Sequence, residues 1–439
     1  MSGRYHSYSE YKESGIVWVG KAPDHWHPVR FKHALLEKKK TSNPNLEAGS
    51  ISFGNVVFKN SDNLSAETKD SYQEVLSGEF LINPLNLNYD LISLRTALSE
   101  INVVVSTGYI VLLSNDRLIK KYTRWLLQQF DVAHMKTLGS GVRQTINYSD
   151  IGNSFFFEPS QDEQTKIANF LDYETAQIDT LIDKQQQLIK LLKEKRQAVI
   201  SHAVTKGLNP DAPMKNSGVE WLGEVPEHWV VAKLKYFADM QGGFAFSSDS
   251  FLENGVQLLR IGNVYQNRLD LSRQPIFIDH CFKESHKEYV VTHGDILMSL
   301  TGTLGKRDYG FAVCVEDKDL FMLNQRLAKI SPKSSKITSS YLLYSIWSNT
   351  YLDPLYLLPS GTKQANLSNE NVLSINVAVP PDKEEQDRIS QYVKDKLSRF
   401  DGLLNHSEGV INLLSERRTA LISAAVTGKI DVRNWQLAG

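Results

Sequence analysis

The chain contains two copies of the same frame, and this internal repeat limits the folds it can adopt more than any other feature. The opening block recurs with identical spacing in the second half: Ser14, Gly15, Trp18, Gly20, Pro23, His25 and Trp26 match Ser217, Gly218, Trp221, Gly223, Pro226, His228 and Trp229. A closing block that begins at Gln164 recurs from Gln386, with a larger offset than the opening block. The second insert between the blocks is therefore longer than the first. Two like frames around unlike inserts suit a protein that presents two different surfaces at a fixed separation.

The length and composition limit the class of protein. With 439 residues the chain can form two or more domains with their own cores, and the repeat places the division near residue 210. The formal net charge of −1 gives no support from bulk charge for binding nucleic acid. The two cysteines, Cys281 and Cys314, form no close pair and indicate neither a disulfide framework nor a zinc site. Because no long apolar stretch and no apolar leader is present, we expect a cytoplasmic protein that is neither secreted nor membrane-spanning.

The segment 163–206 contains neither proline nor glycine, which predicts a helix of roughly 65 Å. Its apolar residues fall on two heptad series, as in the a and d positions of a coiled coil. The first copy has Leu171, Ile178, Leu192 and Val199 in one series and Leu181 and Leu188 in the other; the second copy has Val393, Phe400, Leu414 and Leu421, then Leu403 and Val410. Both copies therefore keep the same seam.

A polar residue interrupts the first series of each copy at the equivalent position, Gln185 in one and Ser407 in the other. These matching interruptions predict that the two helices pair with each other inside one chain, with the polar positions helping to fix the register. The alternative is that each helix packs separately on its own domain. Gly402 and Gly409 weaken the second helix by about 1 kcal/mol each relative to alanine.

The inserts, about residues 30–158 and 233–380, alternate short β-rich runs with turns and helical stretches, which is typical of mixed α and β domains. Three short matches relate them: Gly54-Asn55-Val56 with Gly262-Asn263-Val264, Gly78-Glu79-Phe80-Leu81 with Gly294-Asp295-Ile296-Leu297, and Gly141-Val142-Arg143-Gln144 with Gly361-Thr362-Lys363-Gln364. We therefore expect an α+β protein with two mixed α/β domains that share a fold. An antiparallel intramolecular coiled coil of two long helices separates them, with pseudo-twofold symmetry. The strand order is not indicated.

The order, duplication and spacing of these parts resemble the specificity subunit of type I restriction-modification systems. The resemblance covers nearly the whole chain and rests on the two Trp-x-Gly-x-x-Pro-x-His-Trp blocks and the two heptad helices. It implies a first target-recognition domain with the opening block at residues 1–158 and a central long helix at 159–213. A second target-recognition domain follows at 214–380, and a C-terminal long helix and tail at 381–439.

The resemblance also implies a function. In that family each target-recognition domain reads one half of a bipartite asymmetric DNA site, and the paired helices act as a ruler between the halves. The subunit is not an enzyme and needs no cofactor. It docks two modification subunits, which use S-adenosylmethionine to methylate adenine at N6, and through them restriction subunits, the motor and nuclease, which require ATP and Mg²⁺.

The best candidates for contact with double-stranded DNA are the matching loops at 140–144 and 360–364. Glycine lets the backbone approach a phosphate, a cation supplies charge, and glutamine can bind a phosphate or an adenine edge. The candidate residues are Gly141, Arg143, Gln144, Gly361, Thr362, Lys363, Gln364, Lys306, Asn55 and Asn263. Lys306 follows a glycine turn, and the two asparagines occupy matching Gly-Asn-Val runs. An ordinary β-turn with an exposed cation is the alternative for each loop.

Other patterns are weaker. Thr301 to Arg307 lacks the spacing and the Ser or Thr of a P-loop. Asn83-Pro84-Leu85-Asn86 lacks the second proline and the aromatic residue of an amino-methyltransferase motif. His25 and His228 have no second ligand nearby, which favours packed structural residues where the inserts meet the helices over bases or metal ligands. A coiled-coil scaffold that binds protein or RNA is the alternative function, and a single-chain restriction and modification enzyme is a third.

Overall fold

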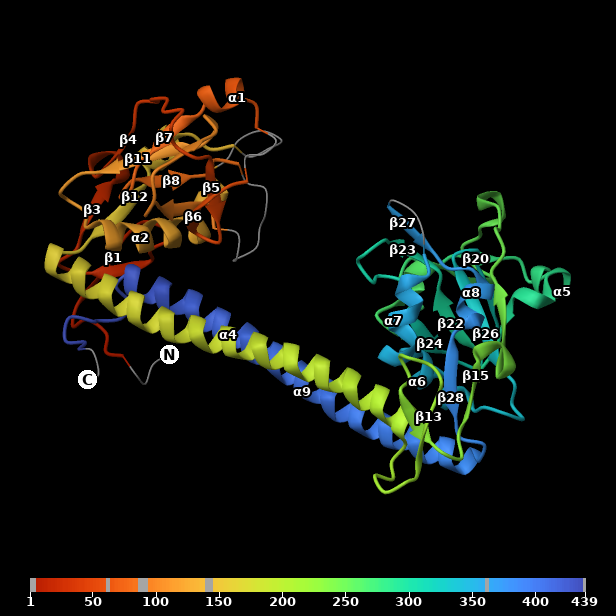
Figure 1. Ribbon diagram of the computed structural model, residues 1–439. Helices are drawn as coiled ribbons and strands as arrows, with labels where there is room; N and C mark the ends of the chain where they lie inside the picture. The colour runs from red at the N-terminus through yellow and green to blue at the C-terminus, as the bar shows by residue number, and fades with distance from the viewer. Residues whose placement is uncertain (1–4, 61–63, 86–93, 139–144, 360–362, 437–439) are drawn as a thin grey trace. The chain divides into compact units, whose positions relative to one another are not determined.

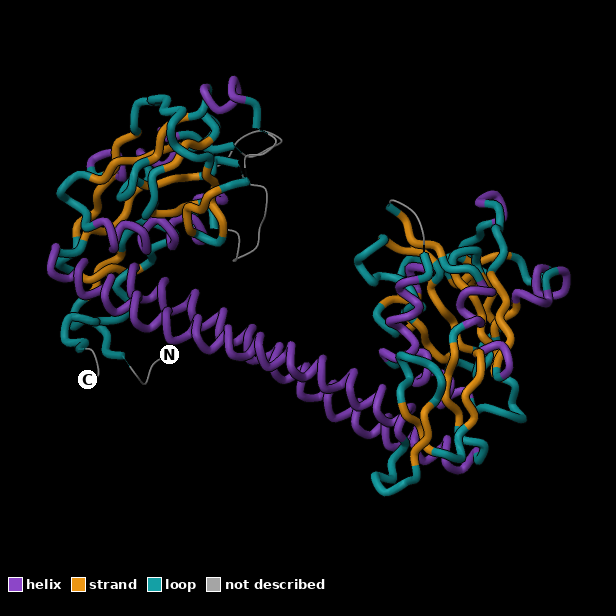
Figure 2. Tube along the Cα trace, in the orientation of Figure 1, coloured by secondary structure: helices purple, strands orange, loops and turns teal. Residues whose placement is uncertain are grey.

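The structure is a computed structural model and describes residues 5–436 except 61–63, 86–93, 139–144 and 360–362. The chain divides into two compact units, unit 1 with residues Met1–Gln185 and Gly409–Gly439 and unit 2 with residues Gln186–Glu408. Both long helices, α4 (Gln161–Lys206) and α9 (Lys383–Val426), contribute residues to each unit. Figure 2 shows the strands grouped within each unit and the two helices side by side.

A six-stranded sheet forms the centre of unit 1, with the order β4-β11-β8-β9-β6-β5. Helix α2 (Lys120–Ala133) packs on this sheet, and its buried face includes Tyr122, Trp125 and Phe130 (Figure 1). The strands are β4 (Leu35–Glu37), β5 (Gly49–Ser52), β6 (Asn55–Phe58), β8 (Phe80–Ile82), β9 (Thr96–Leu98) and β11 (Ile110–Ser114), with a separate pair β7 (Gln73–Val75) and β10 (Val103–Val105) and helices α1 (Ala66–Asp70) and α3 (Tyr148–Asn153).

Unit 2 is built around two four-stranded sheets, β16-β26-β22-β24 and β20-β17-β25-β21. The first contains β16 (Ala238–Gly242), β22 (Ile296–Ser299), β24 (Ala312–Cys314) and β26 (Leu327–Pro332). The second contains β17 (Val256–Leu259), β20 (Phe277–Ile278), β21 (Val290–Val291) and β25 (Phe321–Leu323). Unit 2 also contains the hairpin of β18 (Val264–Tyr265) with β19 (Arg268–Leu269) and the antiparallel pair of β23 (Thr301–Thr303) with β27 (Gln364–Asn366). Its shorter helices are α5 (Phe282–Ser285), α6 (Ser339–Trp347), α7 (Asn349–Leu357) and α8 (Asn369–Ser374).

The two inserts share a core topology, as the short sequence matches predicted. The order β4-β11-β8-β9 in unit 1 corresponds to β16-β26-β22-β24 in unit 2, and every neighbouring pair is antiparallel. Glu79 and Asp295 close equivalent turns, since the carboxylate of each accepts from the backbone N–H three residues earlier, at 2.8 and 2.9 Å. The inserts therefore have this four-stranded arrangement in common and differ in the strands and loops around it.

One of the three matches does not carry over. Phe53 and Gly54, with φ of 49° and 75°, form the tight turn of the β5–β6 hairpin, and Asn55 begins β6. In unit 2, Gly262 and Asn263 lie in the short 3-10 helix η5 (Ile261–Asn263). The shared Gly-Asn-Val letters thus occupy different backbone structures, and the prediction that they are equivalent was wrong.

The repeated blocks frame each insert with equivalent strand pairs. In unit 1, β1 (Tyr11–Glu13) pairs with β2 (Lys21–Pro23), and β3 (His27–Arg30) pairs with β12 (Phe155–Glu158). In unit 2, β13 (Met214–Asn216) pairs with β14 (Glu224–Pro226), and β15 (Val230–Lys233) pairs with β28 (Asn376–Val379). The C-terminal segment completes the first frame, because His6 forms a β-bridge with Asp431.

The two long helices pair antiparallel, as the heptads predicted. In unit 1 the guanidinium of Arg418 donates to Asp179 at 2.8 Å. In unit 2 Arg196 forms an ion pair with Asp401 at 3.4 Å. Asp401 and Arg418 are the repeat copies of Asp179 and Arg196, so each unit makes the same contact with the helices exchanged. The register is also the same in both units, because the step from Asp179 to Arg196 along α4 equals the step from Arg418 back to Asp401 along α9.

The predicted second heptad series was wrong by one residue. Leu181 and Leu188 of α4 are 47% and 42% exposed, and Leu403 of α9 is 51% exposed. The less exposed positions instead alternate at spacings of four and three: Ile178, Ile182, Gln185, Ile189 and Leu192 in α4, and Val393, Leu397, Phe400, Leu404, Ser407, Ile411, Leu414, Arg418 and Leu421 in α9. Gln185 and Ser407 do lie on the seam, and Ser407 is buried. Among the described residues, no helix is long and apolar enough to span a membrane.

Candidate nucleic-acid interface

Each insert is fixed to a long helix by a glutamate carboxylate. This carboxylate accepts hydrogen bonds from a tryptophan indole and a histidine ring of the repeated opening block. In unit 1, Glu163 near the start of α4 accepts from the Trp26 indole at 3.3 Å and lies 2.8 Å from His25 Nε2. In unit 2, Glu385 accepts from the Trp229 indole at 3.0 Å and lies 2.8 Å from His228 Nε2. Both histidines therefore lie where the inserts meet the helices, as predicted, with a carboxylate as their partner.

The electrostatics of Glu163 fit this structural role. Burial raises the pKa of its carboxyl. Hydrogen bonds from His25, Trp26 and Ser160 lower this pKa by more than burial raises it, so the net pKa lies below the usual value. A carboxylate that stays charged while largely buried is an effective acceptor for the indole N–H. The Trp-His blocks thus act as anchors of the frame.

A glutamine next to each anchor fixes the start of one helix of the insert. Gln164 accepts from the Ile119 backbone N–H at 2.9 Å, and its amide donates to the carbonyls of Arg117 and Pro159. Its copy, Gln386, makes the corresponding bonds with Thr338, Lys336 and Pro380 at 2.8 to 2.9 Å. The helices α2 and α6 therefore begin at equivalent places on the two frames.

In unit 2 the structure brings three of the predicted DNA contacts together on one β-ribbon. β23 pairs antiparallel with β27, and the Leu304 backbone N–H donates to the Lys363 carbonyl at 3.1 Å. Lys306 lies in the turn after β23, and Lys363 and Gln364 lie at the start of β27, all three exposed. Gly302 is closely packed in this ribbon, because a Cβ there would force the Asp308 carboxylate and the Tyr309 ring to shift.

The two adjacent cations of this turn differ in their surroundings. Arg307 forms an ion pair with Asp353 at 3.2 Å and lies 5.0 Å above the Tyr356 ring. Within the described part of the chain, Lys306 and Lys363 form no ion pair. Their ammonium groups are therefore available to a phosphate, whereas Arg307 is held by the protein.

The other predicted contacts are placed differently. Gly141, Arg143, Gln144, Gly361 and Thr362 lie outside the described residues. Asn55 is exposed at the start of β6. Asn263 is buried, and its amide donates to the carbonyls of Asp270 and Arg273 at 2.9 and 3.1 Å. Its side chain is thus occupied within the fold and orders the segments around it.

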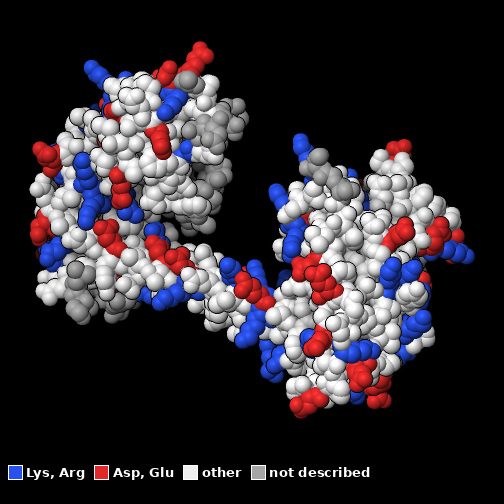
Figure 3. All heavy atoms as spheres, viewed as in Figure 1, with Lys and Arg blue, Asp and Glu red and all other residues white. Residues whose placement is uncertain are grey.

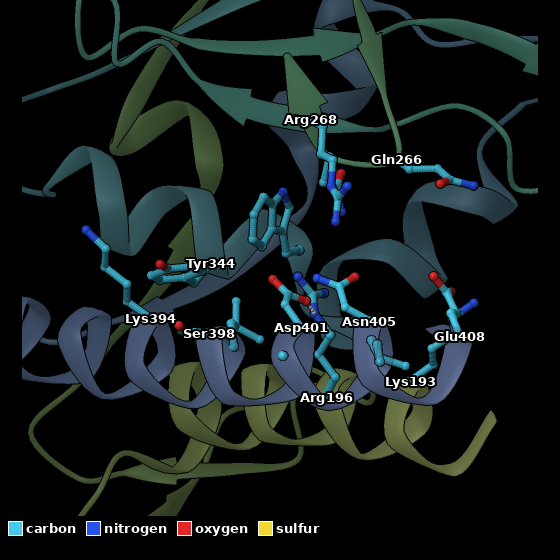
Figure 4. A pocket seen from close by; sticks show the side chains of 15 residues that line it. Lys193, Arg196, Gln266, Arg268, Tyr344, Lys394, Ser398, Asp401, Asn405 and Glu408 are labelled. Carbon is cyan, nitrogen blue, oxygen red and sulfur yellow. Dashed lines mark ion pairs between the residues drawn. The ribbon is translucent and has the colours of Figure 1, made fainter. Parts of the chain in front are cut away.

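A polar cleft of about 800 Å³ in unit 2, shown in Figure 4, was not indicated by any sequence pattern. Lys193 and Arg196 of α4, Lys394 and Asn405 of α9, and Arg268 of the β18–β19 hairpin line it. Gly402 also faces this cleft, where a Cβ would meet no protein atom within 4 Å. Because the lining comes from several separate segments, only the folded chain assembles it.

Charge alone does not single out a binding face. Acidic and basic side chains are interspersed over the visible face of each unit (Figure 3), in keeping with the net charge of −1. A surface for DNA must therefore come from local groups of cations without neighbouring carboxylates.

Known proteins with the same sequence features belong to DNA restriction systems. Residues 226–412 match the family described as "Type I restriction modification DNA specificity domain". The chain is 28% identical over 278 residues to the type I restriction enzyme MjaVIII specificity subunit of Methanocaldococcus jannaschii, covering 63% of this chain and 62% of that protein. It is 24% identical over 289 residues to the type I restriction enzyme EcoBI specificity subunit of Escherichia coli, covering 63% of this chain and 58% of that one.

A solved chain described under "Structural basis underlying complex assembly and conformational transition of the type I R-M system" matches this fold with a TM-score of 0.66. Its sequence is 16% identical, and the match covers 92% of this chain and 98% of that one. The likeness shows a shared fold. The chain spans about three fifths of the length of the curated relatives above.

Proposed function

Because residues 226–412 match the type I restriction-modification DNA specificity domain and the curated relatives are specificity subunits, we propose that this chain is such a subunit and recognises DNA for its system, each unit reading one half of a bipartite asymmetric site. The observation that carries this proposal is that the two frames are alike whereas the two inserts differ. The anchors at Glu163 and Glu385 repeat contact for contact, whereas the loops around the shared sheet differ in length and structure. Divergent loops on a shared scaffold suit the reading of two different base sequences.

We further propose that two identical modification subunits dock on this chain, bringing adenine-N6 methylation and, through them, the motor and nuclease subunits. Two copies of one partner need two equivalent surfaces. Each unit exposes leucines from both helices: Leu181 and Leu413 in unit 1, and Leu188, Leu191 and Leu403 in unit 2. Leu403 and Leu413 are the repeat copies of Leu181 and Leu191. Exposed apolar side chains at matched positions support such docking, and the chain itself then needs no S-adenosylmethionine, ATP or Mg²⁺.

Selection from a random duplex pool tests the function. The full chain, mixed with the modification subunit of its own system, is expected to enrich two fixed half-sites separated by a spacer of constant length. Single-molecule methylome sequencing of a host that carries both subunits should report the same site. A coiled-coil scaffold would enrich no bipartite sequence, and that outcome would exclude the proposal.

The β23–β27 ribbon predicts a sequence-independent contact. Replacing Lys306 and Lys363 by alanine should weaken binding about equally on all duplexes and lower the salt slope of the binding constant by about 1 per lysine. Binding is measured by fluorescence anisotropy between about 50 and 200 mM salt. Arg307→Ala is the matched control, because its guanidinium is already paired with Asp353. An unchanged slope in the double variant would identify the ribbon as an ordinary turn.

A further inference from the structure

A second pocket of unit 2 carries three arginines and, among its lining residues, no carboxylate. Arg260, Arg273 and Arg326 come from three separate segments and line a cavity of about 440 Å³ together with the amides of Gln274, Asn324 and Gln325. We call it the arginine pocket. Within the described part of the chain, none of the three guanidinium groups forms an ion pair. Three positive charges thus line the pocket without a carboxylate among its lining residues, although Asp270, which is not one of them, interacts electrostatically with Arg273.

Hydrogen bonds within the protein fix the positions of two of these arginines. The Arg260 backbone N–H donates to the side-chain oxygen of Asn263 at 2.9 Å, and the amide of Asn263 donates to the Arg273 carbonyl at 3.1 Å. Arg260 Nη2 donates to the carbonyl of Gln274 at 3.0 Å, and Gln274 has a positive φ of 47°. A non-glycine residue at positive φ is uncommon and is kept only where the surroundings enforce it. The buried Asn263 is therefore a positioning residue for the arginine pocket.

One donor of the arginine pocket lacks an acceptor. Arg260 Nε is buried and has no hydrogen-bond partner in the structure. A buried, unpaired donor on a charged group is unfavourable, and an acceptor that reaches it removes this penalty. Phe246 and Phe251 form an apolar wall beside it, which lowers the local dielectric and strengthens any ionic contact made there.

The chemistry selects an anion with several oxygens. Planar guanidinium groups bind phosphate through paired hydrogen bonds, and amide groups add further donors. A guanine edge also accepts from arginine, but it is neutral and cannot offset three positive charges. A phosphate both accepts these hydrogen bonds and supplies the missing charge.

We propose that the arginine pocket binds a backbone phosphate of the DNA beside the half-site read by unit 2, an inference that rests on the proposed function. Gly262 at its mouth provides a steric probe, since a Cβ there would meet no protein atom within 4 Å. Gly262→Ala should leave the fold intact and obstruct only a ligand that approaches the backbone.

The test uses the full chain mixed with the modification subunit of its own system and duplex DNA, with binding measured over a range of salt concentrations. Arg273→Ala and Arg326→Ala change exposed residues. Each is expected to lower affinity about three- to tenfold on all sequences and the salt slope by about 1. Gly262→Ala should lower affinity without changing thermal stability. Arg388→Ala is the control, because this exposed arginine of unit 2 pairs with Asp382 and should leave the slope unchanged.

The outcomes separate the two proposals. If the wild-type chain binds no duplex DNA, the proposed function fails. If it binds DNA and the arginine variants keep its slope, only the arginine pocket is overturned. A loss of preference at one base pair with an unchanged slope would mean base reading, which also overturns a phosphate contact. Inorganic phosphate at constant ionic strength distinguishes a free anion: stabilisation of the wild type alone, with DNA affinity equal in all variants, would contradict binding of a DNA phosphate.

Discussion

Seven residues inserted into each long helix, after Gln187 in α4 and after Gly409 in α9, should lengthen the spacer between the half-sites by about three base pairs and leave both half-site sequences unchanged. Seven helical residues add about 10.5 Å, and a base pair of B-DNA rises about 3.4 Å. Both insertion points are the same number of residues from the contact between Asp179 and Arg418. One follows Asp179 along α4, and the other precedes Arg418 along α9. A whole heptad in both helices keeps the spacing of the seam.

Methylome sequencing of a host that carries the lengthened subunit measures the new spacer directly. Seven residues inserted after Gln187 alone form the control. This variant shifts the later residues of α4 against α9, so Arg196 loses Asp401, and it should lose stability and methylation together. If the doubly lengthened subunit directed methylation at the original spacing, the helices would not set the separation of the half-sites.

Trp26→Ala should destabilise unit 1 by about 3 to 5 kcal/mol, because it empties a site filled by a large, completely buried side chain. The indole also donates to Glu163 and packs edge-on against Tyr8, at 5.9 Å between ring centroids. Gly428, just after the end of α9, lies close to the same ring, since a Cβ added there would be 3.2 Å from it. The substitution therefore loosens an insert from both long helices at once.

Hydrogen exchange followed by mass spectrometry measures this effect, because a chain with two units has no single unfolding free energy. Protection should fall in peptides of unit 1 and persist in most of unit 2. Trp221→Ala is the matched control: it removes the same side chain from a repeated block, but Trp221 is 44% exposed, and the cost should stay below about 1 kcal/mol. Equal losses from the two variants would contradict an anchoring role for Trp26.

The sequence was sufficient to predict the helix pair but not the side chains that face each other within it. Gln185 and Ser407 identified one heptad series correctly because each interrupts it at the same place. The other series was misplaced because apolar residues occur in adjacent pairs, such as Leu181-Ile182 and Leu403-Leu404. Spacings of three and four both suit a helix, so only packing decides which member of a pair is covered.

The candidate interface was harder to predict than the fold. The ribbon with Lys306 and Lys363 joins segments that are distant in the sequence, and the arginine pocket joins three segments of unit 2. The residues that form the ribbon and those that form the arginine pocket follow no regular spacing in the sequence, so no sequence motif identifies either group. Asn263 was selected for its match with Asn55, yet its role follows from burial and from the two carbonyls that it binds. Such roles depend on tertiary contacts that a single sequence does not encode locally.

The division of the chain also affects the order in which it folds during synthesis. Unit 2 is contiguous, Gln186–Glu408, whereas unit 1 needs residues from Gly409 onward to close its frame, including the bridge between His6 and Asp431. Domains usually fold in the order in which they leave the ribosome. Here the unit whose synthesis begins first is completed last. The frame around the first insert lacks its C-terminal segment until the second insert has been translated.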